Sequence, residues 1–374
     1  MPTNQTQSQY GPRCTGMNGT ALLCSGIAAL LIALVVLLSS CAALAQEAPA
    51  KAAGHNGFVL AVCFSPDSRF LASGGDDHTI KIWSPATGAL VRTIPVGRLN
   101  EPRALCFQPG TDFLTFQDGI HLKLQDVATG KEVCAWEADP DFKHVGGVNS
   151  MQYSPDGRTL LCGWESGGWT LWQQEDIKLG AGAQPIMTWK AVRDVQTNGL
   201  CAVRFAPDVN RIAAAAEFGD VVQFWKAGTA EPTQTLTFPD EMCYGMDSSP
   251  SGHRLAVVFE KALVELDADT GKILHKITLS YGHAAASSPR TNALAVADGT
   301  TVKIFDVQRS HIEHVLSGHT QVIFALAYSP DGRWIASGSR DRTVRLWNAQ
   351  TGALQFTLGT DAKVRPEQLQ APKD

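Results

Sequence analysis

A serine, a histidine and an aspartate occur together twice in this chain, each time followed by a tryptophan. In a hydrolase, such a serine attacks the substrate, the histidine takes its proton and the aspartate orients the histidine. Both sets have the same internal spacing, and this repetition favours a scaffold over an active site. The two sets are His55, Ser73, Asp77 and Trp83, and His319, Ser337, Asp341 and Trp347.

The elements around the second set are predicted to be short antiparallel strands. Within residues 316–352, apolar side chains alternate in Ile323–Tyr328, 334–337 and 343–347, and a Ser-Pro-Asp-Gly turn closes the first run. Alternation at period two, interrupted by Pro, Gly and Asp, is typical of strands. Residues 54–88 repeat this pattern almost position by position. A unit that recurs in this way predicts a repeat architecture.

Both copies resemble WD40 repeats. The shared marks are a Gly-His opening, a Ser-Pro-Asp turn, and an Asp six residues before a Trp, as in Asp77 and Trp83. The resemblance implies repeats of about 40–45 residues with four strands per propeller blade. It also implies that each set is a structural tetrad, in which hydrogen bonds run from the Trp through the Ser and the His to the Asp.

The proline of the Ser-Pro turn gives the register of the repeats. It recurs in seven units, which predicts an all-β fold with a closed seven-bladed propeller over 54–358. Extra residues at 174–196 are expected to form a surface loop, and Leu354–Leu358 the last outer strand. Ring closure is expected to rely on packing between the first and seventh blades. The turn prolines are Pro66, Pro109, Pro155, Pro207, Pro250, Pro289 and Pro330. The predicted blades are 54–96, 97–137, 138–189, 190–237, 238–277, 278–315 and 316–358.

Residues 1–45 are predicted to be an export leader. The apolar run 21–38 is followed by Leu38-Ser39-Ser40-Cys41, which resembles a bacterial lipobox, cut before Cys41 with lipidation of its thiol. Alternatively, cleavage before Gln46 releases a soluble exported protein, or the run stays as a membrane anchor. Each alternative exports the repeats to a periplasm, a cell surface or the medium. Residues 46–53 are expected to be a linker and 359–374 a mobile tail.

Composition argues against several functions. Charged residues make up 18% of the chain and the net charge is −5, whereas a nucleic-acid partner normally requires a basic face. None of the nine cysteines has a Cys-x-x-Cys spacing, so no zinc site is predicted. Cys63, Cys106 and Cys201 are expected to be small buried hydrophobes, with a disulfide between neighbouring blades as the alternative.

An enzymatic alternative rests on the innermost strands, because propeller enzymes gather their ligands on the central channel. Apart from Cys and Tyr, the ionisable side chains expected there are Arg204, Asp247 and His283. Calcium needs six or more oxygen ligands and catalytic zinc usually three protein ligands. No cofactor or metal is therefore predicted, and the alternative is an exported hydrolase or lyase that uses these three residues.

In WD40 proteins, the residue just before the tetrad Asp points toward the top face. Here these positions carry four carboxylates, one arginine and, in two adjacent blades, phenylalanine. An aromatic pair in a charged rim is typical of a protein-binding hot spot, although both phenylalanines could instead turn inward. The carboxylates would suit a basic peptide or patch. The predicted positions are Asp76, Asp118, Glu165, Phe218, Phe259, Asp298 and Arg340.

The sequence therefore predicts a non-catalytic protein–protein interaction platform, exported and tethered at the cell envelope through the N-terminal lipid or apolar segment. The alternatives are the exported propeller enzyme and a purely structural envelope protein without a discrete partner.

Overall fold

The structure is a computed structural model that describes residues 54–97, 101–138, 146–177, 186–195, 199, 202–206, 210–216, 221–226, 229, 231–309 and 311–359. The chain divides into two units, Met1–Lys51 and Ala52–Asp374. Cys41, the predicted leader and linker and residues 360–374 lie outside the described residues. The described part consists of strands and turns without a helix, and so none of it forms a helix suited to crossing a membrane.

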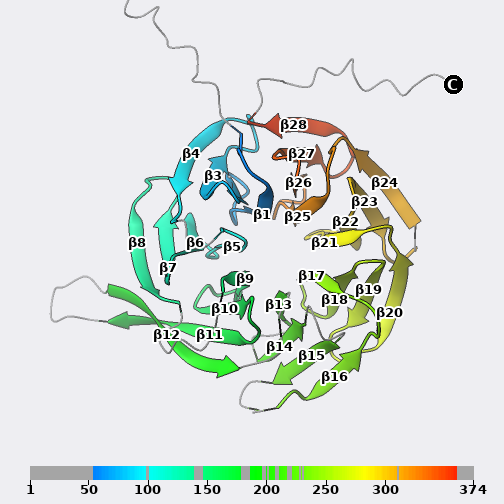
Figure 1. Ribbon diagram of the computed structural model, residues 1–374, viewed down its shortest axis with the longest axis horizontal. Coiled ribbons are helices and arrows are strands. Elements are labelled where there is room, and N and C mark those ends of the chain that lie inside the picture. Colours follow the sequence, from blue (N-terminus) through cyan, green and yellow to red (C-terminus); the bar gives the residue numbers. More distant parts are fainter. Residues whose placement is uncertain are drawn as a thin grey trace, which may run out of the picture. The chain divides into compact units, whose positions relative to one another are not determined.

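Seven four-stranded antiparallel sheets surround a common centre in the second unit (Figure 1). In each sheet the first strand lies innermost and the fourth outermost. This is the seven-bladed propeller that the repeated turn prolines predicted. The first four blades contain β1 (Val59–Phe64), β2 (Leu71–Gly75), β3 (Thr79–Trp83), β4 (Leu90–Pro95); β5 (Leu105–Phe107), β6 (Phe113–Asp118), β7 (His121–Asp126), β8 (Glu132–Glu137); β9 (Val148–Tyr153), β10 (Thr159–Trp164), β11 (Trp169–Ile177), β12 (Ile186–Val195); and β13 (Ala202–Phe205), β14 (Arg211–Ala215), β15 (Val221–Lys226), β16 (Gln234–Thr237). The other three contain β17 (Cys243–Ser248), β18 (Arg254–Phe259), β19 (Ala262–Asp267), β20 (Ile273–Thr278); β21 (Gly282–Ser287), β22 (Ala293–Asp298), β23 (Thr301–Asp306), β24 (His311–Ser317); and β25 (Ile323–Tyr328), β26 (Trp334–Ser339), β27 (Val344–Asn348), β28 (Leu354–Leu358).

The Ser-Pro-Asp-Gly turn between the first two strands of blade 7 is held by its own side chains. The Ser329 hydroxyl donates to Asp331 Oδ1 at 2.6 Å and accepts the backbone N–H of Trp334 at 2.9 Å. Gly332 adopts a φ of 70°, which is the left-handed region where glycine is favoured. The turn therefore fixes where β25 ends and β26 begins, and this explains why its proline marks the register.

The predicted surface loop at 174–196 is wrong at 174–177 and 186–195, which are strands, while 178–185 and 196 lie outside the described residues. Residues 186–195 form β12, the outer strand of blade 3, which pairs with β11 from Trp169↔Val195 to Ile177↔Ile186. The predicted boundary between blades 3 and 4, at 189/190, falls inside this strand. Trp189 explains the outcome: it is 5% exposed and its ring stacks on Trp136 of blade 2, at 5.4 Å between centroids. Glycine and proline near 180–185 suggested a loop, but the buried aromatic side chain requires a strand.

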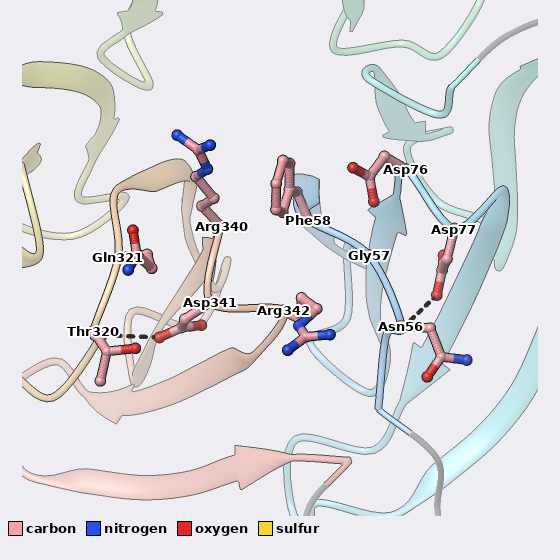
Figure 2. Close-up of a pocket in the computed structure, with 10 residues that line it drawn as sticks. All are labelled: Asn56, Gly57, Phe58, Asp76, Asp77, Thr320, Gln321, Arg340, Asp341 and Arg342. Carbon is pink, nitrogen blue, oxygen red and sulfur yellow. Dashed lines mark hydrogen bonds between the residues drawn. The ribbon is translucent and has the colours of Figure 1, made fainter.

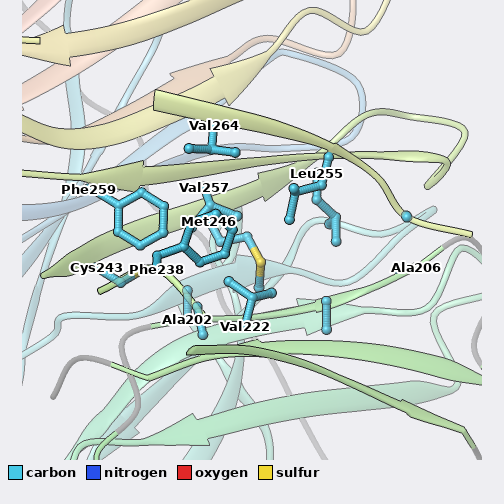
Figure 3. Close-up of a cluster of buried hydrophobic side chains, with 14 of the residues drawn as sticks. Ala202, Ala206, Val222, Phe238, Cys243, Met246, Leu255, Val257, Phe259 and Val264 are labelled. Carbon is cyan, nitrogen blue, oxygen red and sulfur yellow. The ribbon is translucent and has the colours of Figure 1, made fainter. Parts of the chain in front are cut away.

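Apolar side chains fill the space between neighbouring blades. Figure 3 shows one such cluster at the contact of blades 4 and 5, where Val222 packs with Phe238, Met246, Val257 and Phe259. Burying each side chain of this size contributes about 1.5–3 kcal/mol. These clusters hold each blade against the next.

Polar side chains connect the blades at the rim. In four blades, a side chain of the outer strand donates a hydrogen bond to the next blade. The acceptor is a backbone carbonyl near the turn that connects the third and fourth strands of that blade. The bonds are Arg92 Nε to Val127 O at 3.2 Å, Arg193 Nη1 to Lys226 O at 3.0 Å, Gln234 Nε2 to Thr270 O at 3.0 Å and His314 Nε2 to Gln350 O at 3.0 Å.

Blades 1 and 7 close the ring by packing. Each is built from a contiguous segment, and β28 (Leu354–Leu358) is the outer strand of blade 7, as predicted. The N–H of Gly54 donates to the carbonyl of Gly359 at 3.2 Å. Gly338 of β26 lies so close to Val59 of β1 that a Cβ at this position would be 2.6 Å from Val59 Cγ1. The two sheets therefore meet at a distance that only glycine permits.

Candidate partner-binding surface

Hydrogen bonds connect the four side chains of each set in blades 1 and 7. In blade 1, the Trp83 indole N–H donates to Ser73 Oγ at 2.8 Å. The Ser73 hydroxyl is 2.8 Å from His55 Nε2, and His55 Nδ1 is 3.0 Å from Asp77 Oδ1. Because the carboxylate only accepts, the proton of His55 lies on Nδ1 and Nε2 accepts from the serine. In blade 7, the corresponding distances are 2.9 Å (Trp347 to Ser337), 2.7 Å (Ser337 to His319) and 2.8 Å (His319 to Asp341).

Neither serine is positioned for nucleophilic attack. Ser73 and Ser337 are both 0% exposed, so no substrate reaches either hydroxyl. Burial raises the pKa of Asp77, but the hydrogen bonds from His55, from the hydroxyl of Thr79 and from the backbone N–H of Asn56 outweigh it and leave the pKa well below its usual value. Asp341 behaves in the same way. These charge-assisted bonds stabilise one arrangement of strands.

Two of the predicted top-face carboxylates instead form hydrogen bonds and ion pairs within their own blades. Asp118 accepts the N–H of Gly97 at 2.6 Å and pairs with Lys123 at 2.7 Å. Asp298, with its side chain 2% exposed, pairs with Lys303 at 2.6 Å and accepts the N–H of Tyr281 at 2.8 Å. Each aspartate is followed directly by a glycine in a tight hairpin and by a lysine five residues later. The pairs are Asp118 with Lys123 and Asp298 with Lys303. They anchor the entry loop of a blade that lacks the full tetrad.

The predicted phenylalanine pair is not found on the surface. Phe259 is 1% exposed and its ring packs on Phe238 at 4.9 Å between centroids, in the cluster of Figure 3. Its position on β18 points into the contact between blades, so this prediction is wrong and the alternative, that it turns inward, is right. Phe218 lies outside the described residues. Glu165 is exposed and accepts the N–H of Gly147 at 3.3 Å.

Asp76 and Arg340 are brought together at an open groove of about 960 Å³ between blades 1 and 7 (Figure 2). Asp76 follows β2, and Arg340 follows β26. Figure 2 shows the ring of Phe58 between these two side chains, and the Arg340 guanidinium lies over that ring at 5.0 Å. The groove is lined by Asn56, Gly57, Phe58, Asp76, Asp77, Thr320, Gln321, Arg340, Asp341 and Arg342.

A row of aromatic rings continues from this groove across the inner ends of blades 7, 6 and 5. Phe58 lies 6.4 Å from Phe324, Phe324 5.2 Å from His283, and His283 4.8 Å from Tyr281 and 4.5 Å from Tyr244, between ring centroids. Tyr281 is 37% exposed. Burial lowers the pKa of His283 to about 4, so this ring is neutral at pH 7 and the row carries no charge.

This row was not predicted from the sequence, although the register of the turn prolines contains its signal. Tyr244, His283 and Phe324 each stand six residues before a turn proline, at 250, 289 and 330. Three successive blades thus carry an aromatic ring at one position of the innermost strand. Phe58 and Tyr281 share a second position, eight residues before the prolines at 66 and 289.

The three candidate channel residues do not form one site. Arg204 Nε is 3.3 Å from Asp247 Oδ1, and Asp247 Oδ2 accepts the N–H of Ser287 at 2.7 Å. Arg204 also donates to Ser150 Oγ at 2.9 Å. His283, by contrast, is surrounded by aromatic rings. The ion pair therefore joins blades 4 and 5, while His283 belongs to the aromatic row.

The described residues contain neither a disulfide nor a group of side chains placed to bind a metal ion. Cys63 and Cys106 are free thiols there, and burial raises the pKa of Cys106 to about 11. Cys201 lies outside the described residues. No group of three His, Cys, Asp or Glu side chains in the described ranges is placed to hold a metal ion.

The family model described as "WD domain, G-beta repeat" matches residues 49–84, 141–172 and 310–348. The chain contains WD40 repeats. The matched segments end at or next to Trp83, Trp172 and Trp347, which pair with the second strand of blades 1, 3 and 7. Blades 1 and 7, which have the full hydrogen-bonded sets, are thus among those that the family model finds.

Curated relatives match from about a third to most of this chain. The transcriptional corepressor LEUNIG_HOMOLOG of Arabidopsis thaliana is 25% identical over 77% of this chain and 35% of its own length. The serine-threonine kinase receptor-associated protein of Gallus gallus is 24% identical over 87% of this chain and 89% of its own length. The small ribosomal subunit protein RACK1 of Schizosaccharomyces pombe is 33% identical over 32% of this chain and 39% of its own length. The chain spans only 23–39% of the length of the first four curated relatives that it matches.

Proposed function

We propose that this chain is a non-catalytic platform for protein–protein interaction and that its partner binds the groove between blades 1 and 7. The observation that carries the proposal is the position of Phe58 between Arg340 and Asp76, neither of which has a side-chain hydrogen bond or ion pair with another described residue. An aromatic anchor within a charged rim is the composition of an interaction hot spot. The repeats also support the proposal, because they build rigid strands that hold such loops in place.

The names of the relatives support the same function. One is named as a corepressor, one as receptor-associated and one as a protein of the ribosomal subunit. Each name describes an assembly with other macromolecules and none describes a reaction. The buried serines of the two tetrads, and the mutual pairing of Arg204 with Asp247, also support a non-catalytic role.

The charge of the partner follows from which groups remain free. The basic partner expected from the sequence relied on four top-face carboxylates. Asp118 and Asp298 are neutralised by lysines, and Glu165 accepts a backbone N–H. Asp76 has no side-chain partner among the described residues, and it shares its groove with the exposed Arg340 and Arg342. Of the four carboxylates, Asp76 and Glu165 therefore keep a charge that no described cation neutralises, and the acidic rim that favoured a basic partner is reduced by half.

For localisation, we propose export and tethering at the cell envelope through lipid-modified Cys41. The proposal rests on the apolar run 21–38 and the lipobox-like residues that follow it. Intact mass and N-terminal sequencing of the mature protein test it. A chain that begins at lipidated Cys41 is expected. A chain that begins at Gln46 would give a soluble exported protein, and a chain that keeps residues 21–38 would overturn both cleavage proposals.

Site-directed photo-crosslinking in the native host tests the interaction platform. A photoreactive phenylalanine analogue replaces Gln321 in the groove or, as control, Arg309, whose side chain is 79% exposed in the turn between β23 and β24. We expect one discrete protein cross-linked from position 321 and not from 309. Arg340→Ala should abolish this product. Equal products from both positions, or no discrete product from 321, would overturn the proposed platform.

A further inference from the structure

The Arg340 side chain has the arrangement of a receptor for a carboxylate. Its guanidinium lies over the Phe58 ring at 5.0 Å, and its side chain is exposed. Stacking uses the flat face of the group, whereas the five N–H donors point outward in its plane. Among the described residues none accepts a hydrogen bond from these donors. The guanidinium is thus held near the ring of Phe58 while its N–H donors have no acceptor among the described residues.

A second guanidinium stands two residues away in the same turn. Arg342 is exposed, lines the same groove and has a φ of 70°. This backbone conformation is uncommon for a residue other than glycine, and it sets the direction of the side chain. Its guanidinium also lacks an ion pair in the part of the chain described. The two arginines give blade 7 a local positive charge at the edge of the groove.

The negative groups of the groove balance this charge only in part. Asp77 and Asp341 already accept hydrogen bonds from a histidine, a threonine hydroxyl and a backbone N–H each. Asp76 alone remains, and Figure 2 shows it on the other side of Phe58 from Arg340. An incoming carboxylate is therefore attracted to the blade 7 side of the groove.

Beyond Phe58 the surface becomes aromatic and uncharged. Phe324, His283 and Tyr281 continue the row toward blade 6. These rings suit a partner side chain that is apolar or aromatic, because the row has no ion to pair with a charged one. Aromatic contacts of this kind add to binding beyond what the buried area contributes.

We propose that the groove binds an acidic peptide segment of a partner protein, in which an Asp or Glu side chain is gripped by Arg340 while a nearby aromatic or large apolar side chain lies on the Phe58–Phe324–Tyr281 row. This inference rests on the proposed interaction platform and names the chemistry of its partner. A planar carboxylate matches the fork of the guanidinium with two parallel hydrogen bonds. Arg342 adds charge attraction without stacking.

Selection from a library of random dodecapeptides displayed on phage tests the proposal. The full chain is the target, and the selected peptides are then measured by fluorescence anisotropy. We expect sequences that pair Asp or Glu with Phe, Trp, Tyr or Leu. Arg340→Ala should weaken their binding about 10-fold or more, since a hydrogen-bonded charge pair is lost. Arg340→Lys should also weaken it, because an ammonium keeps the charge but not the fork.

Arg333→Ala is the matched control. Arg333 and Arg340 stand at opposite ends of β26, and the Arg333 side chain is 77% exposed outside the groove. This variant should bind the peptides as the wild type does, and thermal melting verifies that each variant is folded. Selected peptides that are basic, or whose binding survives Arg340→Ala, would overturn the acidic segment and leave the interaction platform standing. Selection of no peptide at all would overturn both.

Discussion

Trp83 and Trp225 occupy equivalent positions in blades 1 and 4, yet of the two only Trp83 has an acceptor for its indole N–H among the described residues. Trp83 donates to Ser73 Oγ at 2.8 Å. The Nε1 atom of Trp225 is buried and finds no acceptor among the described residues. Both side chains are buried, at 0% and 4% exposure. The two tryptophans therefore fill equivalent space in the core, but only in blade 1 does the indole take part in a described hydrogen-bond network.

This difference predicts unequal effects of Trp83→Phe and Trp225→Phe. Both substitutions remove similar apolar volume, but only the first also deprives the Ser73–His55 chain of a donor. We expect Trp83→Phe to lower the free energy of unfolding by about 1–2 kcal/mol more than Trp225→Phe. Urea unfolding followed by circular dichroism measures both. Equal losses would mean that the tetrad contributes nothing beyond packing.

The buried pair of Asp298 and Lys303 predicts a second stability effect. Lys303→Met leaves the carboxylate, 2% exposed, without its cation, and we expect a loss of about 2–4 kcal/mol. The double variant with Asp298→Asn should recover part of this loss, because no charge is then buried alone. Lys276→Met serves as the control, since its ion pair with Glu241 is exposed on the lysine side and should contribute about 1 kcal/mol or less. Additive single effects in the double-mutant cycle would contradict a coupled pair.

His283 predicts a dependence of stability on pH. Burial lowers its pKa to about 4 in the folded protein, whereas an unfolded histidine titrates near 6.5. Between these values the unfolded chain binds more protons, so stability falls as the pH drops from about 6.5 to 4. In His283→Phe this contribution is absent, and its melting temperature should fall less over the same interval. Parallel curves for the two proteins would show that His283 does not titrate in this way.

Phe58 and Phe259 predict opposite phenotypes. Phe259 is 1% exposed, and its replacement by alanine should lower the free energy of unfolding by about 3–5 kcal/mol. Phe58 is half-buried at the groove, and Phe58→Ala should lower it by roughly 1 kcal/mol while weakening binding of a selected peptide. Anisotropy titrations at a temperature where both variants are folded separate the two effects. Wild-type peptide affinity in Phe58→Ala would contradict its role as an anchor.

The sequence predicted the fold well because the turn chemistry recurs. A turn proline follows each innermost strand in the sequence, and a serine precedes it in five of the seven blades, so seven prolines locate seven sheets even in blades without a tetrad. The failure in blade 3 has a physical reason. Glycine and proline near 180–185 signalled a loop, whereas the strand that follows depends on Trp189, which packs on a neighbouring blade. Contacts between blades are not visible in a local pattern.

The candidate surface was predicted less well, because exposure depends on partners that the sequence places elsewhere. Asp118 and Asp298 lie at the expected register positions, but each forms an ion pair with a lysine five residues later and so does not face a partner freely. Phe259 faces the contact of two blades, and this direction follows from the pleat of β18 rather than from its residue type. The aromatic row could have been found, because Tyr244, His283 and Phe324 share one register position.

The groove lies over the junction of blades 1 and 7, the place where the N–H of Gly54 meets the carbonyl of Gly359. Elsewhere the chain itself runs from one blade to the next, but here neighbouring blades are joined by contacts alone. A segment bound along Phe58 and Arg340 contacts both blades at once. It therefore links blade 1 to blade 7 at the point where the ring closes. By linkage, its binding energy adds to the stability of the closed propeller, so a partner would both recognise this protein and protect it from unfolding at its ends.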